Sequence, residues 1–584
     1  MIDGIFKKLS TVQVVVSVTS SIAMIVDSII ISRFMGMTSV AAVGLIVPMM
    51  MFILAFSGVL SSGGQLGVGK KLGRGNIEGA SDCLSLNIAL ILISSIVLIA
   101  IAFCFTEKIC LLLGATPNSE LLFESEKYLM GFILGTPGII GMLGLIPIMN
   151  MDGDKKRTTI SAIAATVGDI VLDIVAVIIF PGNIFAIGIA SSISYMIAFV
   201  ILLSHFFEKN GKYVLYISFK NIPWRETVDV FKQGSPAALQ KILRTLLSFT
   251  LNYILLKAGG ELALGSFTIV SNVGNLVNSI GQGLSAATLT VSGVMYGERV
   301  KKNLADLYKA MLKYSVLWNL VALAFTLIAA NLFANIFKST KSSDLSVVAT
   351  GLRIFAFDYV FYSICLCAKS FYQGIGRMKV NYVITIFEGY ICIALFSWLF
   401  ASRWGVYGVC MGYVVGDAVS ILSILIVTII INKTFPKKLS EFLLLPDDYS
   451  IKEEDMLCAE VTSIEDAIEV SQRVNEFVSN HNSSHSKEGV KLSIAVEEFC
   501  KNIIQYGFEN EKKAKLEVIV IYENGNFTLQ IKDNCRKFSP VEYMKLHADS
   551  VEKEKYNGIP LVFNLAKNID YYSVLGINKL IVEM

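Results

Sequence analysis

Charged residues are scarce in this chain: they make up 17% of 584 residues, whereas hydrophobic residues make up 54%. The mean hydropathy of +0.62 is far too apolar for a soluble protein of this length, which excludes a wholly soluble protein. The ten cysteines show no CxxC pair and no metal-ligand spacing, so we interpret them as reduced packing residues. No cleavable signal peptide is evident, because the first apolar stretch continues as a membrane-spanning helix.

Apolar runs of about 20 residues, long enough to cross a ~30 Å hydrocarbon layer, are present twelve times before residue 435 and are lacking after it. Lysine and arginine gather in every second connection between these runs, as in Lys70/Lys71 and Lys155/Lys156. By the positive-inside rule, this pattern places both termini in the cytoplasm. We therefore expect a multi-pass protein of the plasma membrane.

The apolar part contains an internal repeat. Gly36 and Gly73 stand 37 positions apart, and Gly260 and Gly297 repeat that spacing. Two six-helix halves that both start from the cytoplasm would be related by an axis along the membrane normal. Such a duplication predicts a cleft between two bundles, which alternating access requires.

Composition changes abruptly after the last apolar run. The segment SIEDAIEVSQRVNEF is typical of a helix, and LEVIVIY and FTLQIKD, joined by ENGN, are typical of a hairpin. We predict an all-α polytopic membrane protein with twelve spanning helices, followed by an α/β sandwich in the cytosol. The predicted organisation is an N-terminal lobe (1–220), a C-terminal lobe (221–435), a linker (436–459) and a cytosolic domain (460–584).

Acidic residues stand inside the apolar runs of the first half. Asp169 and Asp173 are four positions apart and share one helix face, and Asp27 lies midway along the first run. An unpaired charged carboxylate in hydrocarbon costs several kcal/mol, so such residues usually mark a functional site. The alternative is that they bridge neighbouring helices through serine, threonine and asparagine.

Motifs in both halves resemble the multidrug and toxic compound extrusion (MATE) transporters, over roughly residues 8–432. They include IVDSIIISRFMGMTSVAAVGLIVP, the MDGDKK loop, GQGLSAATLTVSGVMYGE and FYQGIGRMK. The resemblance implies a V-shaped pair of six-helix lobes that exports organic solutes or drugs in exchange for H⁺ or Na⁺. It also implies a cation site in the first lobe, with Asp27 and Asp173 at acidic positions, Asp169 where many relatives have asparagine, and Ser191 supplying a hydroxyl.

Three carboxyl groups in one dry pocket cannot all ionise without a counter-cation, because desolvation and mutual repulsion both oppose it. We therefore expect a proton to be the coupling ion, although oxygen ligands suit Na⁺ equally. In the second half, Asp358, Glu388 and Asp417 are candidates for a second cation or substrate site. Pairing with Lys369 is an equally good interpretation of them, and Arg244 stands where a long side chain can snorkel to the interface.

The C-terminal segment resembles the ATP-binding domain of GHKL proteins, closest to the anti-sigma-factor serine kinases, over about residues 460–584. The motifs are KLSIAVEEFCKNIIQYGFEN, IKDNCRKFSP and NGIPLVFNLAKNIDYYSVLGINKLIVEM. The resemblance implies that Glu498 is a general base, Asn502 a Mg²⁺ ligand, Asp533 the acceptor of the adenine amino group, and Gly558 part of the phosphate loop.

Two glycines expected in that nucleotide-binding domain are replaced. Cys535 stands where a DxG motif has glycine and Pro560 where a GxG motif has it, and glycine there allows positive φ and close approach of the backbone. Proline also removes an N–H donor. Three interpretations stay open: a Mg-ATP-dependent kinase of serine or threonine on a partner such as an anti-anti-sigma-like protein, a nucleotide sensor without catalysis, or a protein-docking module.

The function expected from the whole sequence is cation-coupled export of organic solutes, cations among them, under the control of a cytosolic domain. Two alternatives are a flippase of lipid-linked sugars and a membrane sensor whose C-terminal domain phosphorylates or sequesters a partner. No nucleic-acid partner is expected.

Overall fold

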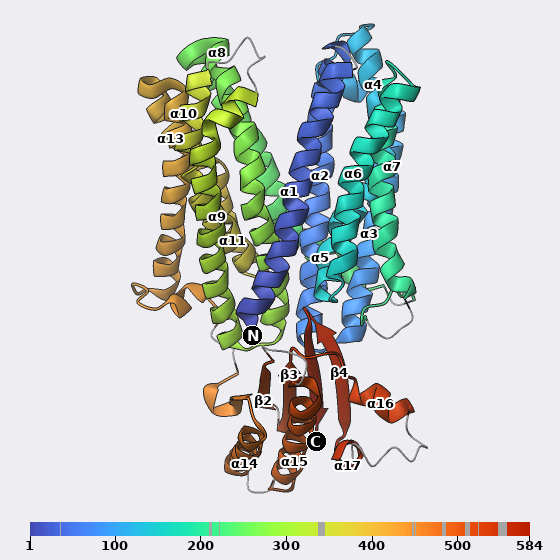
Figure 1. Ribbon diagram of the computed structural model, residues 1–584, viewed down its shortest axis with the longest axis vertical. Coiled ribbons are helices and arrows are strands. Elements are labelled where there is room, and N and C mark those ends of the chain that lie inside the picture. The colour runs from blue at the N-terminus through green and yellow to red at the C-terminus, as the bar shows by residue number, and fades with distance from the viewer. Residues whose placement is uncertain are drawn as a thin grey trace.

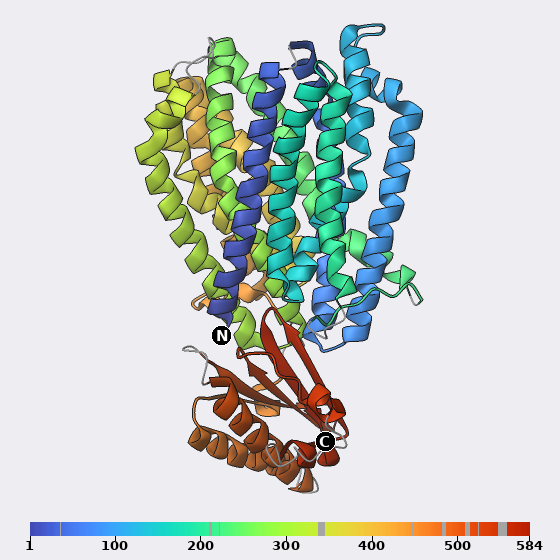
Figure 2. The same ribbon diagram turned by 45° about the vertical axis from the view of Figure 1, so that its right-hand side comes forward.

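A computed structural model shows a long helical unit with a small α/β domain at one end (Figures 1 and 2). The N-terminus lies at the end of the helical unit that faces the small domain, and the C-terminus lies within that domain. The structure describes all residues except 35–36, 209–212, 221, 337–344, 447–448, 450, 482–485, 509–513, 524 and 547–557.

Within the described residues, the first lobe consists of seven consecutive helices, α1 to α7. They are α1 (Ile2–Phe34), α2 (Met37–Gly73), α3 (Ile77–Leu112), α4 (Glu120–Ile133), α5 (Thr136–Met151), α6 (Lys155–Ile179) and α7 (Ile184–Leu203). Helices α4 and α5 are together long and apolar enough to form one membrane span, with a 45° bend between them. The 3₁₀ turns η1 (Ser204–Phe207) and η2 (Trp224–Glu226) follow on the way to the second lobe.

The second lobe repeats this plan. Its elements are α8 (Thr227–Gly297), α9 (Lys301–Ile336), α10 (Leu345–Phe355), α11 (Asp358–Gly374), α12 (Met378–Ile386), the π-helical turn η3 (Phe387–Ile391) and α13 (Cys392–Asn432). Helix α8 breaks at Gly260 (φ 64°) and α13 at Gly405 (φ 52°), where positive φ is open to glycine.

The helical segments of the two lobes can be compared with the predicted twelve spans. Among the described residues, six helices are long and apolar enough to cross a membrane, or up to eight when each of two bent pairs is one span. When α8 and α13 are divided at their glycine breaks and α4–α5 and α10–α11 each count once, both lobes have six helical segments. The predicted two-lobed helical membrane unit is therefore confirmed.

The two lobes touch at Gly73 and Gly297, which occupy equivalent positions in the two halves of the sequence repeat. A Cβ atom at Gly73 of α2 would lie 2.1 Å from the carbonyl oxygen of Val294 and 2.9 Å from Cα of Gly297 in α8. Gly297 is likewise so close to Lys70 that a Cβ atom would lie 2.4 Å from its carbonyl oxygen. Only residues without side chains allow this approach. The repeat-related glycines thus let the two lobes come into direct backbone contact at the end that carries the α/β domain.

The C-terminal domain is a five-stranded antiparallel sheet in the order β1-β2-β3-β5-β4. Its elements are β1 (Met456–Val461), α14 (Ile464–His481), α15 (Ser486–Asn502), β2 (Leu516–Glu523), β3 (Asn526–Asp533), α16 (Pro540–Leu546), α17 (Gly558–Leu565), β4 (Asn568–Val574) and β5 (Ile577–Glu583). Strand β1 begins inside the segment predicted as a linker.

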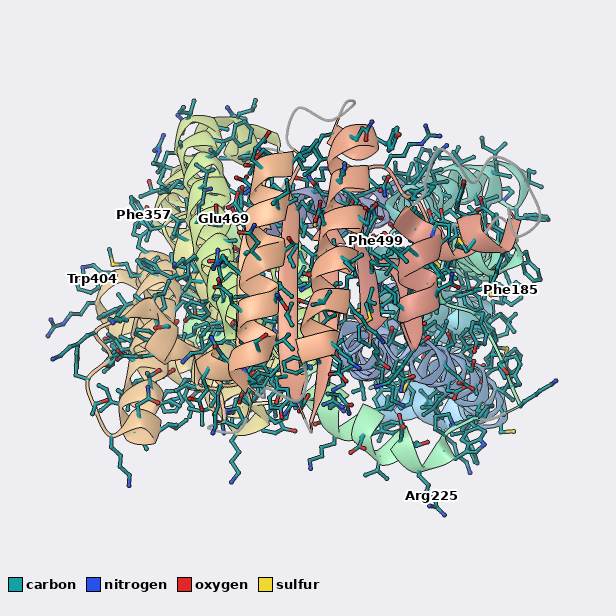
Figure 3. The ribbon with its side chains drawn as sticks, turned by 90° about the horizontal axis from the view of Figure 1, so that it is seen from below. Phe185, Arg225, Phe357, Trp404, Glu469 and Phe499 are labelled. Carbon is teal, nitrogen blue, oxygen red and sulfur yellow. The ribbon has the colours of Figure 1, made fainter. Side chains whose placement is uncertain are left out.

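The two faces of this sheet have different neighbours. Helices α14 and α15, which carry the labelled Glu469 and Phe499, cover one face (Figure 3). On the other face, Ile519 and Ile521 of β2 pack against Val300, which lies between α8 and α9. The membrane unit therefore covers the second face of the sheet.

Candidate functional site

The acidic pair of the first lobe is buried in α6. Asp169 is 3% exposed and Asp173 is fully buried. Neither carboxylate oxygen of Asp173 makes a hydrogen bond within the described part of the chain. Helix α1 packs against α6, but the side chain of Asp27 lies outside the described residues. The gathering of all three carboxyl groups in one pocket therefore stays a prediction.

Helix α7 brings Ser191 to the same depth as the acidic pair. Ser161 of α6 donates a 2.9 Å hydrogen bond to the carbonyl oxygen of Ala198 in α7. Because the two helices are antiparallel, Ser191, seven residues before Ala198, lies near the level of residue 168, one position before Asp169. Ser191 itself is buried, with 7% of its surface exposed.

The second lobe holds a larger group of buried charges. Glu388, in the π-helical turn η3, accepts hydrogen bonds from Arg244 of α8 and from Lys369 of α11, the latter at 2.5 Å. The Arg244 guanidinium lies 5.0 Å from the ring centre of Tyr362. Arg244 thus turns toward the lobe interior instead of the interface that its sequence position suggests. π-Helical turns are frequent at functional sites.

Asp358 of α11 and Asp417 of α13 form a second acidic pair beside that ion triad. Both are fully buried, and their carboxyl groups face each other. Within the described ranges, none of their four oxygens makes a hydrogen bond of ordinary geometry. Two adjacent carboxyl groups that are fully buried need a shared proton or a cation between them. The three predicted second-lobe residues therefore lie together.

In the C-terminal domain, the end of β3 presents the predicted adenine acceptor. Asp533 is 6% exposed, and its Oδ1 atom accepts 2.8 Å hydrogen bonds from the Cys535 N–H and from Asn578 Nδ2. Cys535 is not among the described residues with positive φ, so this position does not require glycine. Asn578, which holds the carboxylate in place, was not identified from the sequence.

The predicted phosphate end of that nucleotide site lies between α15 and α17. Glu498 reaches the first residue of α17, where a Cβ atom on Gly558 would lie 1.6 Å from Glu498 Oε2. Asn502 Nδ2 donates to the carbonyl oxygen of Glu498 at 2.8 Å. Pro560 falls in the first turn of α17, where a helix tolerates proline but one N–H available to an anion is lost. The adenine end therefore fits a nucleotide better than the phosphate end does.

A buried ion triad joins the C-terminal domain to the membrane unit. Glu298, between α8 and α9, contacts Lys532 of β3 at 2.9 Å and Lys579 of β5 at 2.7 Å. Asn303 adds a 2.7 Å hydrogen bond to the same carboxylate. Burial by itself would raise the pKa of Glu298, but the two ammonium groups outweigh it and lower this pKa to about 2.

This lowered pKa predicts how docking of the domain depends on pH. Because it lies below the ordinary value of 4.5, the ion pairs stabilise the docked domain above pH 4.5 and are lost as the pH falls through about 2. Between about pH 5.5 and pH 8, amide exchange in β4 and β5, corrected for its intrinsic pH dependence, should therefore stay constant. A tenfold change over that interval would contradict the assignment of Glu298 as the charged partner.

Two lobes of six helical segments, related by a repeat and lined with buried carboxyl groups, define a secondary transporter of the membrane. A nucleotide-binding type of α/β domain is attached to it. The chain matches the MatE family model over residues 13–175 and 236–399, more than half of its length, and therefore belongs to the MatE family. Residues 461–584 match the model of the histidine kinase-like ATPase domain. Both resemblances seen in the sequence are thus confirmed.

Individual relatives agree with this assignment. Multidrug export protein MepA of Staphylococcus saprophyticus subsp. saprophyticus is 21% identical over 357 residues, which cover 60% of this chain and 77% of MepA. The probable multidrug resistance protein YoeA of Bacillus subtilis is 22% identical over 430 residues, covering 70% and 89%. A structure described as the outward-facing conformation of a multidrug resistance MATE family transporter superposes with a TM-score of 0.68 at 23% identity, covering 72% of this chain and 94% of that one.

Proposed function

We propose that this protein exports organic solutes or drugs in exchange for H⁺ or Na⁺. The observation that carries the proposal is the fully buried Asp173, whose carboxylate oxygens make no hydrogen bond within the described residues. In a membrane interior such a group is stable only when a proton or a metal cation neutralises it. Its neighbour Asp169, on the same helix face, strengthens that requirement.

The coupling cycle follows from this charge balance. A cation that enters from outside neutralises the acidic pair of α6, and the first lobe then packs around an uncharged site. Release of the cation to the cytoplasm restores the charge and reopens the site to substrate. Asp358 and Asp417 supply the second lobe with a pair of the same kind, which would take up a second cation or a positively charged group of the substrate.

The C-terminal domain is proposed to bind Mg-ATP as a regulator. Asp533 is held in position by Asn578 to accept the adenine amino group, and Asn502 and Glu498 lie on one face of α15 toward the phosphate end. Transport driven by a cation gradient needs no ATP, so binding would adjust transport or the capture of a cytosolic partner protein. With both termini in the cytoplasm, this domain has access to cellular ATP.

Flux measurements on the purified full chain in proteoliposomes test the transporter directly. We expect efflux of a cationic dye, driven by an imposed pH gradient or Na⁺ gradient and abolished by a proton ionophore or by removal of Na⁺, respectively. A membrane sensor is the second candidate, because the buried ions Glu298, Lys532 and Lys579 connect the two domains directly. Absence of flux under both gradients, with intact ATP binding, would favour the sensor.

Nucleotide binding gives a separate prediction. Asp533→Asn places an amide where the adenine amino group needs an acceptor, and the loss of a charge-assisted hydrogen bond should weaken ATP binding by ~10-fold or more. Equilibrium binding of labelled ATP to the full chain with Mg²⁺ measures this change. Glu542→Gln, an acid-to-amide change in α16, is the matched control and should leave the affinity within about twofold. Equal affinities for both variants would reject Asp533 as the adenine acceptor.

A further inference from the structure

The turn between β4 and β5 has an unusual backbone for its residues. Leu575 (φ 57°) and Gly576 (φ 81°) both have positive φ, which is the geometry of a type I′ turn. Asparagine or glycine normally occupies the first of these positions, because other side chains are strained there. Leucine is nevertheless present, and it is 2% exposed. An apolar side chain at this tip is explained by what it contacts.

The hairpin tip contacts the first lobe. The N–H of Leu575 donates a 2.7 Å hydrogen bond to the carbonyl oxygen of Met151, the last residue of α5. Tyr572 of β4 lies against Gly75, where a Cβ atom would be 3.1 Å from the tyrosine hydroxyl. Leu575 and Tyr572 belong to a hydrophobic cluster that also includes residues at the helix ends next to the α/β domain. Figures 1 and 2 show this hairpin reaching up to the ends of the helices.

The same hairpin also contacts the second lobe through one ammonium group. Lys579 Nζ lies 2.7 Å from Glu298 Oε1 in the second lobe and 3.4 Å from the carbonyl oxygen of Gly73 in the first lobe. The Lys579 side chain is 3% exposed. Gly73 also touches Gly297, beside Glu298, at the contact between the lobes. Lys579 therefore bridges the two lobes at the point where they meet.

We propose that the β4–β5 hairpin is a clamp that holds the two lobes together at the end bearing the ATPase-like domain. Opening the transporter at this end must separate Gly73 from Gly297, and Lys579 cannot then keep both of its partners. Either the hairpin is released or the lobes stay closed. The role of the clamp in opening rests on the proposed transport function, whereas the contacts that define the clamp do not depend on it.

Two variants release the clamp in different ways. Lys579→Met keeps the length of the side chain and removes the bridging ammonium group. Leu575→Asn creates an Asn-Gly sequence, which favours a type I′ turn, so that the hairpin stays folded while its apolar contact with the first lobe is lost. Glu523→Gln is the matched control, because Glu523 forms an exposed ion pair with Arg299 across the same junction and such pairs contribute little.

Hydrogen exchange of the full chain in nanodiscs measures both docking and lobe closure. We expect ~10-fold faster exchange in β4–β5 and in residues 66–77 and 290–298 for the two clamp variants, and less than about twofold change for Glu523→Gln. Faster exchange in the hairpin alone, with the lobe contact unchanged, would overturn the clamp. Unchanged exchange everywhere would overturn it as well. Absence of solute flux in the unmodified protein would instead contradict the transport function.

The strand register leads to a second inference, which rests on the proposed nucleotide binding and concerns what controls the clamp. Lys532 pairs with Lys579 across β3 and β5, and the next pair is Asp533 with Asn578. Successive residues of a strand point to opposite faces, so Lys532 and Lys579, which both contact Glu298, face the membrane unit, while Asp533 faces α15, near Cys500. We infer that an adenine nucleotide held by Asp533 and Asn578 shifts these two strands and changes how firmly the clamp engages.

Adding Mg-ATP to the same exchange experiment tests this coupling. In the unmodified chain, saturating Mg-ATP should change hairpin exchange at least ~3-fold, and in Asp533→Asn it should not. Binding of ATP without any change in the hairpin would overturn the coupling and leave the clamp intact. Failure of ATP to bind the unmodified chain would overturn both the coupling and the proposed nucleotide function, again without bearing on the clamp.

Discussion

Asp173→Asn should abolish gradient-driven efflux, lowering the initial rate by ~100-fold or more, while the protein still inserts and folds. The amide fits the same volume but cannot lose a proton, so the site stays neutral and the coupling step has no charge change to drive it. Because Asp173 is fully buried and its oxygens make no hydrogen bond within the described residues, asparagine breaks no described contact. Efflux of a cationic dye from proteoliposomes under a pH or Na⁺ gradient measures the effect.

The control for this variant is Glu107→Gln, which makes the same acid-to-amide change at an exposed position of α3. It should transport at the rate of the unmodified protein. Asp169→Asn should retain partial transport, because Asp173 remains on the same helix face as a carboxyl group that can take up the coupling cation. Full activity in Asp173→Asn and Asp169→Asn alike would reject the first-lobe site and leave the second-lobe pair as the coupling centre.

The sequence predicts much of the membrane unit because its signals are local or periodic. Long apolar runs predict the membrane-spanning helices, and the equal spacing of Gly36–Gly73 and Gly260–Gly297 predicts the division into two halves. The structure adds a direct reason for the second glycine of each pair, since Gly73 and Gly297 touch. Both helices need a residue without a side chain at this contact between the lobes. The repeated glycine spacing in the sequence reflects that requirement.

The ion clusters were less predictable, because their members come from distant segments. Glu388 was assigned as a candidate, but its pairing with Arg244 depends on how α8 packs against η3. Lysines in strands normally face solvent, and nothing near Lys532 or Lys579 in the sequence indicates that both are buried. Their burial follows from docking of the sheet on the membrane unit, which only the tertiary structure shows.

The replaced glycine in the nucleotide domain illustrates a different limit. The sequence predicts that Cys535 is unfavourable where a DxG motif has glycine, since glycine permits backbone conformations that other residues avoid. In the structure its φ is not positive, and its N–H still bonds to Asp533 Oδ1 at 2.8 Å. A family pattern therefore overstated how strictly the backbone constrains this position.

Glu388→Gln should strongly destabilise the membrane unit. It leaves Lys369, 5% exposed, and Arg244, 25% exposed, without the carboxylate that both contact. Removing one partner from a buried ion group typically costs about 3–5 kcal/mol. Because Arg244 retains some solvent, the lower end of that range is expected. Thermal unfolding of the purified protein in detergent, followed by intrinsic fluorescence, should show a clearly lowered midpoint.

The triple variant Glu388→Met, Arg244→Met and Lys369→Met separates structural from functional roles of this ion triad. Replacing all partners by apolar side chains removes the uncompensated charge, and such replacements are often neutral or stabilising. The melting midpoint should therefore return to that of the unmodified protein or exceed it. If transport also returns, the triad only stabilises the second lobe. Loss of transport in this stable variant would show that these charges act in the transport cycle, next to the carboxyl pair of Asp358 and Asp417.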